Sequence, residues 1–352
     1  MNHTTPPKSV CILRLSAIGD VCHTLAVVRA LQQAWPETQF TWIIGKLEAK
    51  LLGHLPDIEF IVYDKRSGLK GYWHLRQAMR HRHFDVLLHM QLSIRASLVA
   101  ALVPARIKLG FDRARARELQ WLFTNRRIKP HTQQHVLDGL FGFAEYFGIA
   151  HQTPQWNIPL PDSALGYAQQ VIPDGQATLV ISPCSSHALR NWRAEYYAQV
   201  GDFAAGQLGM RVLICGGPSQ LEKAMGEAIC QYMEQPVTNL VGKDTLLQML
   251  ATLQRATVLL SPDSGPAHMA TAVGTPVIGL YAATNPARSG PYLSRQWCVD
   301  RYTAAAQLLM KKSTSKLPWT TKIEQPGVMD LITPDAVIQM LRALMLSKSG
   351  RS

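Results

Sequence analysis

The sequence lacks several features that would place it in familiar classes of protein. No two of its six cysteines form a Cys-x-x-Cys pair and most lie in apolar segments, so we expect free thiols rather than disulfides or a zinc site. The longest apolar runs, such as residues 98–103, are far too short to cross a bilayer. No apolar stretch typical of a secretory signal precedes the first expected strand. These features predict a cytoplasmic protein.

Common cofactor and nucleic-acid motifs are also missing. The sequence has neither the Gly-x-Gly-x-x-Gly loop of dinucleotide-binding proteins nor a P-loop, and no helix-turn-helix, zinc-finger or RNP-type signature. His131 and His135 are four residues apart, but no acidic residue completes a metal-ligand set there. No Asp-x-Asp cluster occurs either. We therefore expect no nicotinamide cofactor, no bound metal and no nucleic-acid partner.

Positive charge is abundant and unevenly placed. The net charge is +12, and residues 1–150 contain 20 basic against 11 acidic residues, whereas the remainder contains 16 against 13. The excess is densest in residues 65–82 and 106–129. A solvated basic surface would explain this charge, and so would a first domain that faces a membrane surface or a phosphorylated substrate.

Short β-branched runs alternate with segments of helical length, which predicts parallel, doubly wound sheets. A proline-rich stretch at residues 148–161 interrupts the alternation and is typical of a linker. We predict an N-terminal Rossmann-like domain over residues 1–155, a C-terminal one over 156–330 facing it across a cleft, and a final helix within 331–352 that packs back on the first domain. The expected strands are residues 9–15, 40–44, 60–63, 86–89, 107–110, 178–182, 211–215, 257–260 and 277–280. Residues 304–327 are expected to form a long loop.

The segment Asp263-Ser264-Gly265-Pro266-Ala267-His268 runs from an expected strand into a helix predicted over residues 265–272. Asp263 or Ser264 can cap that helix, Pro266 suits its first turn, and Gly265 allows a ligand close to the backbone. The free amides at such a helix start suit a diphosphate, and His268 could add a donor. A well-capped helix without a ligand is the plainer interpretation.

The first strand-to-helix loop reads Ser16-Ala17-Ile18-Gly19-Asp20-Val21-Cys22-His23-Thr24-Leu25. Gly19 would permit a tight turn, with Asp20 at or near the start of a helix ending at Ala34. Asp20 could act as a general base that removes a proton from an acceptor hydroxyl, or it could merely cap the helix. His23 could be no more than a polar residue on an early turn.

Three further loops follow expected strands of the second half. Ser185, Ser186 and Arg190 could bind phosphate oxygens together or form an ordinary polar loop. Glu222 could accept hydrogen bonds from ribose hydroxyls or simply complement a helix dipole. Asp244 lies in a turn expected at the same edge, near where a base would lie.

Taken together, these loops resemble the ADP-heptose:lipopolysaccharide heptosyltransferases, glycosyltransferases of family 9 with the GT-B fold. The resemblance spans nearly the whole chain and depends most on residues 16–25 and 262–268. The first of these segments is more similar to heptosyltransferase I, which adds the first heptose to Kdo, than to heptosyltransferase II. The family usually has Lys where Arg190 stands and Thr at positions 185 and 186.

The resemblance implies an inverting transfer of L-glycero-D-manno-heptose from ADP-heptose to Kdo-lipid A, without a bound metal. Asp20 would be the catalytic base, and Ser16, Gly19, His23 and Arg66 would contact the acceptor. The donor would be held by a larger set of residues: Ser185, Ser186, Arg190, Glu222, Asp244, Asp263, Ser264, Gly265, Pro266 and His268. A basic first domain would suit attachment to the cytoplasmic face of the inner membrane of a Gram-negative bacterium.

Two alternatives remain open. A family 9 transferase could use another nucleotide sugar or a later core acceptor. A chain of a different class could bind a nucleotide sugar at a membrane without catalysis.

Overall fold

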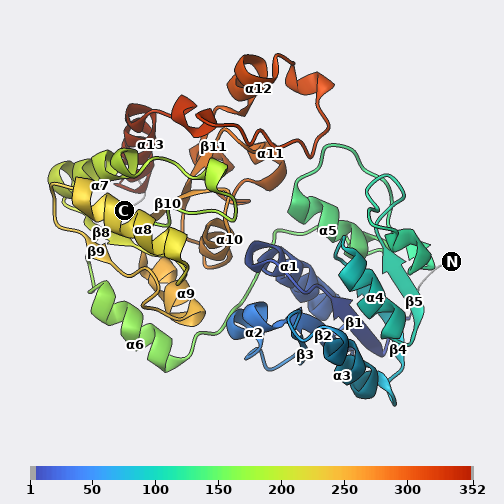
Figure 1. Ribbon diagram of the computed structural model, residues 1–352. Helices are drawn as coiled ribbons and strands as arrows, with labels where there is room; N and C mark the ends of the chain where they lie inside the picture. The colour runs from blue at the N-terminus through green and yellow to red at the C-terminus, as the bar shows by residue number, and fades with distance from the viewer. Residues whose placement is uncertain (1–4, 350–352) are drawn as a thin grey trace. The chain divides into compact units, whose positions relative to one another are not determined.

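Two parallel β-sheets form the cores of two units of the chain, residues 1–159 and 160–352 (Figure 1). The structure is a computed structural model, and it describes residues 5–349. Each sheet has six strands, and all the paired strands run parallel. This arrangement confirms the predicted α/β class with two Rossmann-like halves.

The first unit has the strand order β3-β2-β1-β4-β5-β6. Its elements in chain order are β1 (Ser9–Leu13), α1 (Ile18–Ala34), β2 (Gln39–Gly45), α2 (Lys46–Leu52), β3 (Glu59–Tyr63), α3 (Leu69–Met79), β4 (Phe84–His89), α4 (Ile94–Leu102), β5 (Ala105–Gly110), η1 (Gln120–Leu122), β6 (Arg126–Arg127) and α5 (Val136–Glu145). The order reverses direction between β1 and β4, which is where open parallel sheets usually bind ligands.

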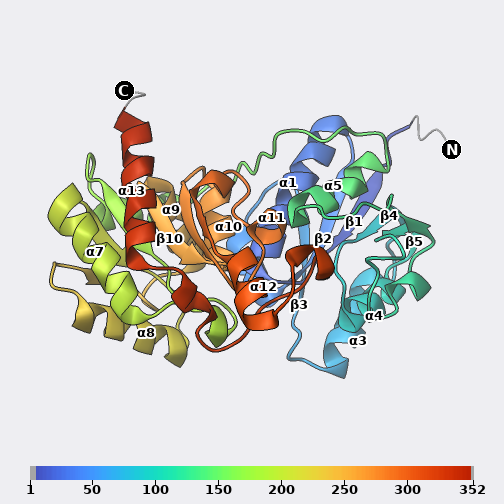
Figure 2. The ribbon, with the colours of Figure 1, turned by 90° about the horizontal axis from the view of Figure 1, so that it is seen from above.

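Helices cover both faces of this sheet. α1 packs with α5, whereas α3 and α4 lie together on the other face (Figure 2). Leu75 and Met79 of α3 join Val99 of α4 and Leu13 of β1 in one buried apolar cluster. The central strands are buried on both faces, so they form nearly continuous apolar runs rather than an alternating pattern. That property is why the sequence predicted them well.

The second unit has a similar six-stranded sheet, with the strand order β12-β11-β10-β7-β8-β9. Its elements are α6 (Asp162–Val171), β7 (Thr178–Ile181), η2 (Ala188–Arg190), α7 (Ala194–Leu208), β8 (Arg211–Ile214), α8 (Gln220–Tyr232), β9 (Thr238–Asn239), α9 (Leu246–Arg255), β10 (Val258–Pro262), α10 (Gly265–Ala272), β11 (Val277–Tyr281), α11 (Pro286–Ser289), η3 (Arg295–Trp297), β12 (Cys298–Asp300), α12 (Tyr302–Met310), η4 (Thr314–Lys316), η5 (Val328–Leu331) and α13 (Pro334–Ser349). The predicted helix over 265–272 is confirmed residue for residue.

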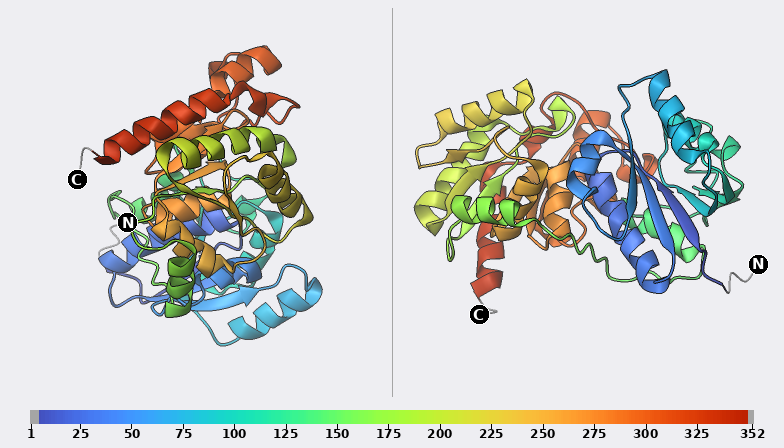
Figure 3. Two further views of the ribbon diagram at one scale, coloured as in Figure 1. Left: turned by 90° about the vertical axis from the view of Figure 1, so that its left-hand side faces the viewer. Right: turned by 90° about the horizontal axis from the view of Figure 1, so that it is seen from below.

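The C-terminal helix belongs to the second unit. α13 packs with α7 of that unit, as Figure 3 shows. Val337, Leu341 and Leu344 lie along one face of the helix and are buried in the core of that unit. Their spacing of three and four residues places them in a single stripe, which explains why the helix docks there.

The structure corrects one expectation about a segment and refines another. Residues 302–310 form α12 instead of the start of a long loop, because Tyr302, Ala305 and Ala306 bury one helical face. The division between the two units falls after residue 159, within the proline-rich stretch predicted as a linker, and the part of the stretch before it packs on the first unit. Trp156 is buried in the first unit, and its indole N–H donates to the carbonyl of Cys22 at 2.8 Å.

The six cysteines are free thiols, as the sequence predicted, and four of them are buried. Among residues 5–349, no helix is both long enough and apolar enough to cross a membrane.

Candidate active site

Asp20 lies at the start of α1, at the carboxyl edge of the first sheet. The helix begins at Ile18, so Asp20 is in its first turn, and its Oδ2 accepts a hydrogen bond from the backbone N–H of Ala17 at 3.1 Å. The same Oδ2 is 2.5 Å from a guanidinium nitrogen of Arg14. Its Oδ1 has no hydrogen bond or ion pair to the part of the chain that the structure describes. The side chain is 36% exposed, so Oδ1 can receive the proton of a bound hydroxyl.

Arg14, which we did not predict, holds this carboxylate in place. It lies just after β1, is only 12% exposed, and donates to the carbonyls of Ser16 at 2.9 Å and Met90 at 2.5 Å. These two backbone carbonyls hold the planar guanidinium, so the ion pair also fixes the rotamer of Asp20. A charged residue directly after a buried strand was the available signal in the sequence.

The structure places the other residues predicted at this site and corrects the expectation for one of them. Gly19 is helical, as the second residue of α1, and makes no tight turn with positive φ. The Ser16 hydroxyl accepts a hydrogen bond from the Gln91 side chain at 3.4 Å. His23 is buried, with its ring edge against His135. Arg66 is exposed in the loop after β3, where its backbone N–H donates to Asp64 at 2.9 Å.

A second carboxyl group, that of Glu48 in α2, lies beside the loop that carries Asp20. A Cβ added to Gly45 would lie 2.2 Å from the carbonyl oxygen of Leu15 and 2.4 Å from Oε2 of Glu48, so both border this glycine. Glu48 is buried, and its burial raises the pKa of its carboxyl above the ordinary value, as the nearby charge of Asp20 also does. Glycine is needed at position 45 because any larger residue would collide there.

In the second unit, the segment 263–268 leads from β10 into α10. Ser264 is the N-cap by backbone geometry, but its hydroxyl bonds to that of Ser261 at 2.7 Å and does not cap the helix. The amides of the first turn have no intrahelical partners, so they favour an anion. The Asp263 carboxylate accepts a hydrogen bond from Ser289 of α11 at 3.0 Å, and His268 is 8% exposed.

A cluster of cations lies near Asp263. Arg190 donates through Nε to Glu324 at 2.8 Å and is paired with it through a second nitrogen, so its charge is balanced internally. Lys322 is exposed and has no ion pair within residues 5–349. Partial desolvation lowers the pKa of its ammonium, and so do the neighbouring charges of Arg190 and Arg288, while Glu324 and Asp263 oppose them. Electrostatic repulsion between these neighbouring cations destabilises the cluster, and an anionic ligand would offset that repulsion.

Lys322 and Arg288 are site candidates that the sequence did not reveal. Lys322 is placed by the backbone N–H of Ile323, which donates to the carbonyl of Ala283 just beyond β11 at 2.7 Å. Arg288 lies in α11. Neither lies in a loop that leads from an expected strand into an expected helix, and Lys322 is one of several lysines in a segment expected to be a loop.

Two of the remaining predicted donor residues, Ser185 and Glu222, form hydrogen bonds within their own loops. The Ser185 hydroxyl donates to the carbonyl of His187 at 2.9 Å, while Ser186 is exposed. The Glu222 carboxylate accepts hydrogen bonds from the N–H of Gly217 at 2.7 Å and from the hydroxyl of Ser219 at 2.6 Å. Glu222 therefore stabilises the start of α8, and the second lone pairs of its oxygens remain for a ligand hydroxyl.

Asp244 precedes α9 and has an unusual environment. Its Oδ2 is buried and makes no hydrogen bond to the described part of the chain. Burial raises the pKa of its carboxyl to about 6. The folded protein therefore binds more protons here than the unfolded chain between about pH 4 and pH 6, so the contribution of Asp244 to stability falls as the pH rises through that window.

We expect Asp244→Asn to raise the free energy of unfolding at pH 8 by about 1–2 kcal/mol, discounted for partial exposure, with little change at pH 4. The replacement removes a charge that the folded state disfavours. Urea unfolding at the two pH values measures the difference, with Glu234→Gln at an exposed position as the control. A loss of stability at pH 8 would mean that the carboxylate has a favourable ionic partner.

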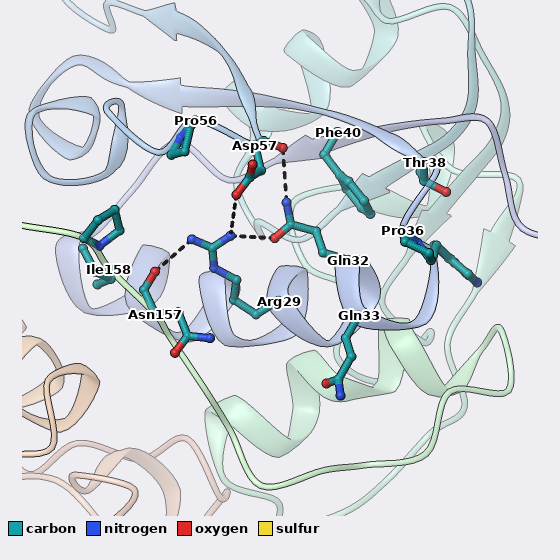
Figure 4. A pocket seen from close by; sticks show the side chains of 12 residues that line it. Arg29, Gln32, Gln33, Pro36, Thr38, Phe40, Pro56, Asp57, Asn157 and Ile158 are labelled. Atoms are coloured by element: carbon teal, nitrogen blue, oxygen red, sulfur yellow. Dashed lines mark hydrogen bonds and ion pairs between the residues drawn. The ribbon is translucent and has the colours of Figure 1, made fainter.

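A hollow of about 850 Å³ on the first unit does not belong to this site (Figure 4). Arg29 crosses it, donating to the carbonyls of Trp156 at 3.0 Å and Asn157 at 3.0 Å and to the side chain of Gln32 at 2.8 Å. The hollow borders the C-terminal half of α1, roughly 15 Å along the helix from Asp20. Several of the polar groups of the hollow therefore already bond to one another.

Two doubly wound parallel sheets, each with polar groups at its carboxyl edge, define a two-domain α/β protein. The sequence itself matches Glycosyltransferase family 9 (heptosyltransferase) over residues 72–319. The chain belongs to this family and is a glycosyltransferase of the heptosyltransferase type.

Individual relatives agree with this assignment. The chain is 44% identical to the lipopolysaccharide core heptosyltransferase OpsX of Haemophilus influenzae, covering 97% of this chain and 99% of that protein. It is 24% identical to lipopolysaccharide heptosyltransferase 1 of Escherichia coli K12, covering 82% and 92%. The structure of the E. coli heptosyltransferase WaaC with ADP superposes with a TM-score of 0.74, at 22% identity and with 96% and 99% of the chains covered. The family is thus confirmed, whereas a particular likeness to heptosyltransferase I is not.

Proposed function

We propose that this enzyme transfers a heptose from ADP-heptose to the inner core of lipopolysaccharide, with a Kdo residue of Kdo-lipid A as the acceptor. The observation that carries the proposal is the 44% identity, over nearly the full length of both chains, to a protein named a lipopolysaccharide core heptosyltransferase. The donor follows from the same family and from the anion-binding features around α10. The Kdo acceptor agrees with the basic character of the first unit.

In the proposed reaction, Oδ1 of Asp20 accepts the proton of an acceptor hydroxyl. The hydroxyl oxygen forms a bond to the anomeric carbon from the side opposite the diphosphate, while the bond from that carbon to the β-phosphate oxygen breaks and ADP leaves. This single displacement inverts the anomeric configuration. Arg14 keeps Asp20 in one rotamer and balances its charge until the hydroxyl arrives. The step as written needs no bound metal.

Charge that develops on the leaving diphosphate would be stabilised by the second unit. The groups proposed for this role are the first-turn amides of α10 and the cations Lys322, Arg288 and Arg190. Asp263 carries a negative charge, so it suits a sugar hydroxyl of the donor better than a phosphate oxygen.

The direct experiment incubates the enzyme with ADP-heptose and a panel of acceptors that includes Kdo-lipid A and later core structures. Mass spectrometry identifies the product, NMR of the new linkage shows its anomeric configuration, and a parallel reaction contains EDTA. We expect one heptose on Kdo, an inverted linkage and no effect of EDTA. Transfer only to a later core acceptor would overturn the acceptor assignment, and no ADP release with any acceptor would favour a non-catalytic binding protein.

We also expect Lys322→Met to weaken the binding of ADP by about tenfold and to leave adenosine binding unchanged, because the ammonium would contact phosphate. Lys322→Arg should retain most of the affinity. Isothermal titration calorimetry measures both ligands, and Lys316→Met, at an exposed position of the same segment, serves as the matched control.

The pairing of Arg190 with Glu324 allows a complementary test. Glu324→Gln removes the internal counter-charge, so we expect ADP to bind several-fold more tightly and the double variant with Lys322→Met to recover part of the lost affinity. Weaker ADP binding by Glu324→Gln would show that this carboxylate organises the site.

A lipid-borne acceptor requires the enzyme to work at a membrane surface. We propose that it attaches peripherally to the cytoplasmic face of the inner membrane, and salt-sensitive binding to anionic vesicles would test this.

A further inference from the structure

Residues 65–129 have an extreme composition. They contain 15 basic and 3 acidic residues, a balance equal to the net charge of the whole chain. The same segment also leaves large apolar side chains in solvent: Leu69, Trp73, Ile94, Leu98, Leu119, Trp121 and Leu122. Single exposed apolar residues are ordinary, but a group of them among cations is not.

The exposed apolar residues of α3 and α4 lie on the outer side of one helical layer. The inner side of the layer packs on the sheet through Leu75, Met79 and Val99. On the outer side, Leu69 is 87% exposed and Trp73, one turn later, is 59% exposed. α4 is apolar around most of its circumference, a pattern typical of a helix buried on all sides, yet it exposes both Ile94 and Leu98.

The short helix η1 brings three more apolar side chains to the start of α4. The Glu118 carboxylate accepts a hydrogen bond from the N–H of Ile94 at 2.6 Å, and the Gln120 amide donates to the carbonyl of His89 at 2.9 Å. These bonds hold Leu119, Trp121 and Leu122 beside the first turn of α4. One of the three acidic residues of the segment is thereby used within the fold.

This surface lies at the same edge of the sheet as Asp20. α3 and α4 begin just after the carboxyl ends of β3 and β4, and β4 pairs with β1, which leads to the Asp20 loop. Two glutamines connect the regions: Gln120 donates to the carbonyl of Gln91 at 3.3 Å, and the Gln91 side chain accepts from the N–H of Leu15 at 2.6 Å. A hydroxyl presented to Asp20 by an acceptor anchored in lipid would therefore come from the side of this surface.

We propose that the outer side of α3, the first turns of α4 and η1 form a docking surface for an anionic phospholipid bilayer, into which Leu69, Trp73, Ile94 and Trp121 insert. The inference rests on the proposed function in that it supplies the contact through which a lipid-borne acceptor is reached. Cations such as Lys70, Arg76 and Arg95 are exposed on the same helices and would meet the lipid phosphates. A nucleic acid would use these cations but would leave the aliphatic side chains without a partner.

The test compares two double variants at exposed positions. Leu69→Ala with Trp73→Ala removes two anchors, and Tyr232→Ala with Leu346→Ala removes two similarly exposed apolar side chains from the second unit. Co-sedimentation uses vesicles of phosphatidylglycerol and phosphatidylethanolamine, with pure phosphatidylcholine vesicles for comparison. We expect the wild type and the control to bind the anionic vesicles, and the first variant to bind them at least about tenfold more weakly.

Transfer assays separate this inference from the proposed function. With a lipid-borne acceptor in vesicles, the Leu69/Trp73 variant should lose most of its rate, whereas with the same acceptor stripped of its acyl chains it should match the wild type. Unchanged vesicle binding by this variant would overturn the docking surface, as would retention of the wild type on duplex DNA but not on vesicles. If vesicle binding falls as expected but the wild type transfers to neither acceptor, the docking surface stands and the proposed function fails.

Discussion

Replacing Asp20 with alanine should lower kcat by about a thousandfold while leaving the Kd of ADP unchanged. The expectation follows from the size of general-base catalysis and from the geometry, in which Oδ1 is unoccupied and Oδ2 is held by Arg14. Transfer is measured as ADP release with saturating donor and acceptor, and ADP binding by calorimetry. Asp20→Asn should behave like the alanine variant because the amide has nearly the same shape but cannot accept the proton.

The variant Arg14→Met tests whether the orientation of the Asp20 carboxylate matters, in addition to its presence. It keeps the carboxylate but removes the group that fixes its rotamer, so we expect a loss of roughly tenfold in kcat and greater loss of activity at high temperature. If Asp20→Ala retains more than a tenth of the wild-type rate, the base lies elsewhere. Glu48 would then be the first alternative because its carboxyl borders the same loop.

The second large loss of activity is expected when Asp263 is replaced. Asp263→Asn should lower kcat/KM for ADP-heptose by about a hundredfold, because the hydrogen bond that a sugar hydroxyl donates to the charged carboxylate would be lost. The binding of ADP itself should not weaken and could become tighter, since a negative charge near the diphosphate is removed. Comparison of the Kd of ADP with the kinetics of ADP-heptose separates the two effects.

Ser289→Ala provides the matched control for Asp263. The Ser289 hydroxyl donates to Oδ2 of Asp263 at 3.0 Å, so its removal should loosen the carboxylate without changing its charge. We expect a loss of roughly fivefold to tenfold in kcat/KM. A variant of Asp263 that binds ADP much more weakly than the wild type would contradict a role directed at the sugar.

The sequence predicted the architecture well because both sheets are parallel and buried on two faces. Such strands form apolar runs that alternate with helices, and chemistry in open α/β sheets gathers at the carboxyl edge. The loops of Asp20 and Asp263 could therefore be proposed from the sequence as candidates. β6, β9 and β12 could not, because strands of two or three residues depend on the neighbour that they pair with rather than on their own pattern.

The candidate site residues that the sequence did not reveal were missed for a similar reason, because their position depends on tertiary contacts. Lys322 and Glu324 follow β10 by about sixty residues, and they reach Arg190 and Asp263 only because Ile323 is fixed beyond the end of β11. Nothing in their local sequence distinguishes them from the lysines and glutamates of an exposed loop. The prediction of a tight turn at Gly19 was wrong for the opposite reason. Glycine is common in turns, but at this position it is an ordinary helical residue of α1.

The anchoring of Trp156 has a practical consequence for dissection of the enzyme. Because this side chain is buried and donates to the carbonyl of Cys22, while Arg29 binds the carbonyls of Trp156 and Asn157, the segment up to Pro159 is an integral strap of the first unit. A fragment that stops near residue 148 would leave an indole-sized hole beside α1 and an unmatched arginine. A fragment of residues 1–159 retains the strap, so it is the better choice for measuring lipid binding without the second unit.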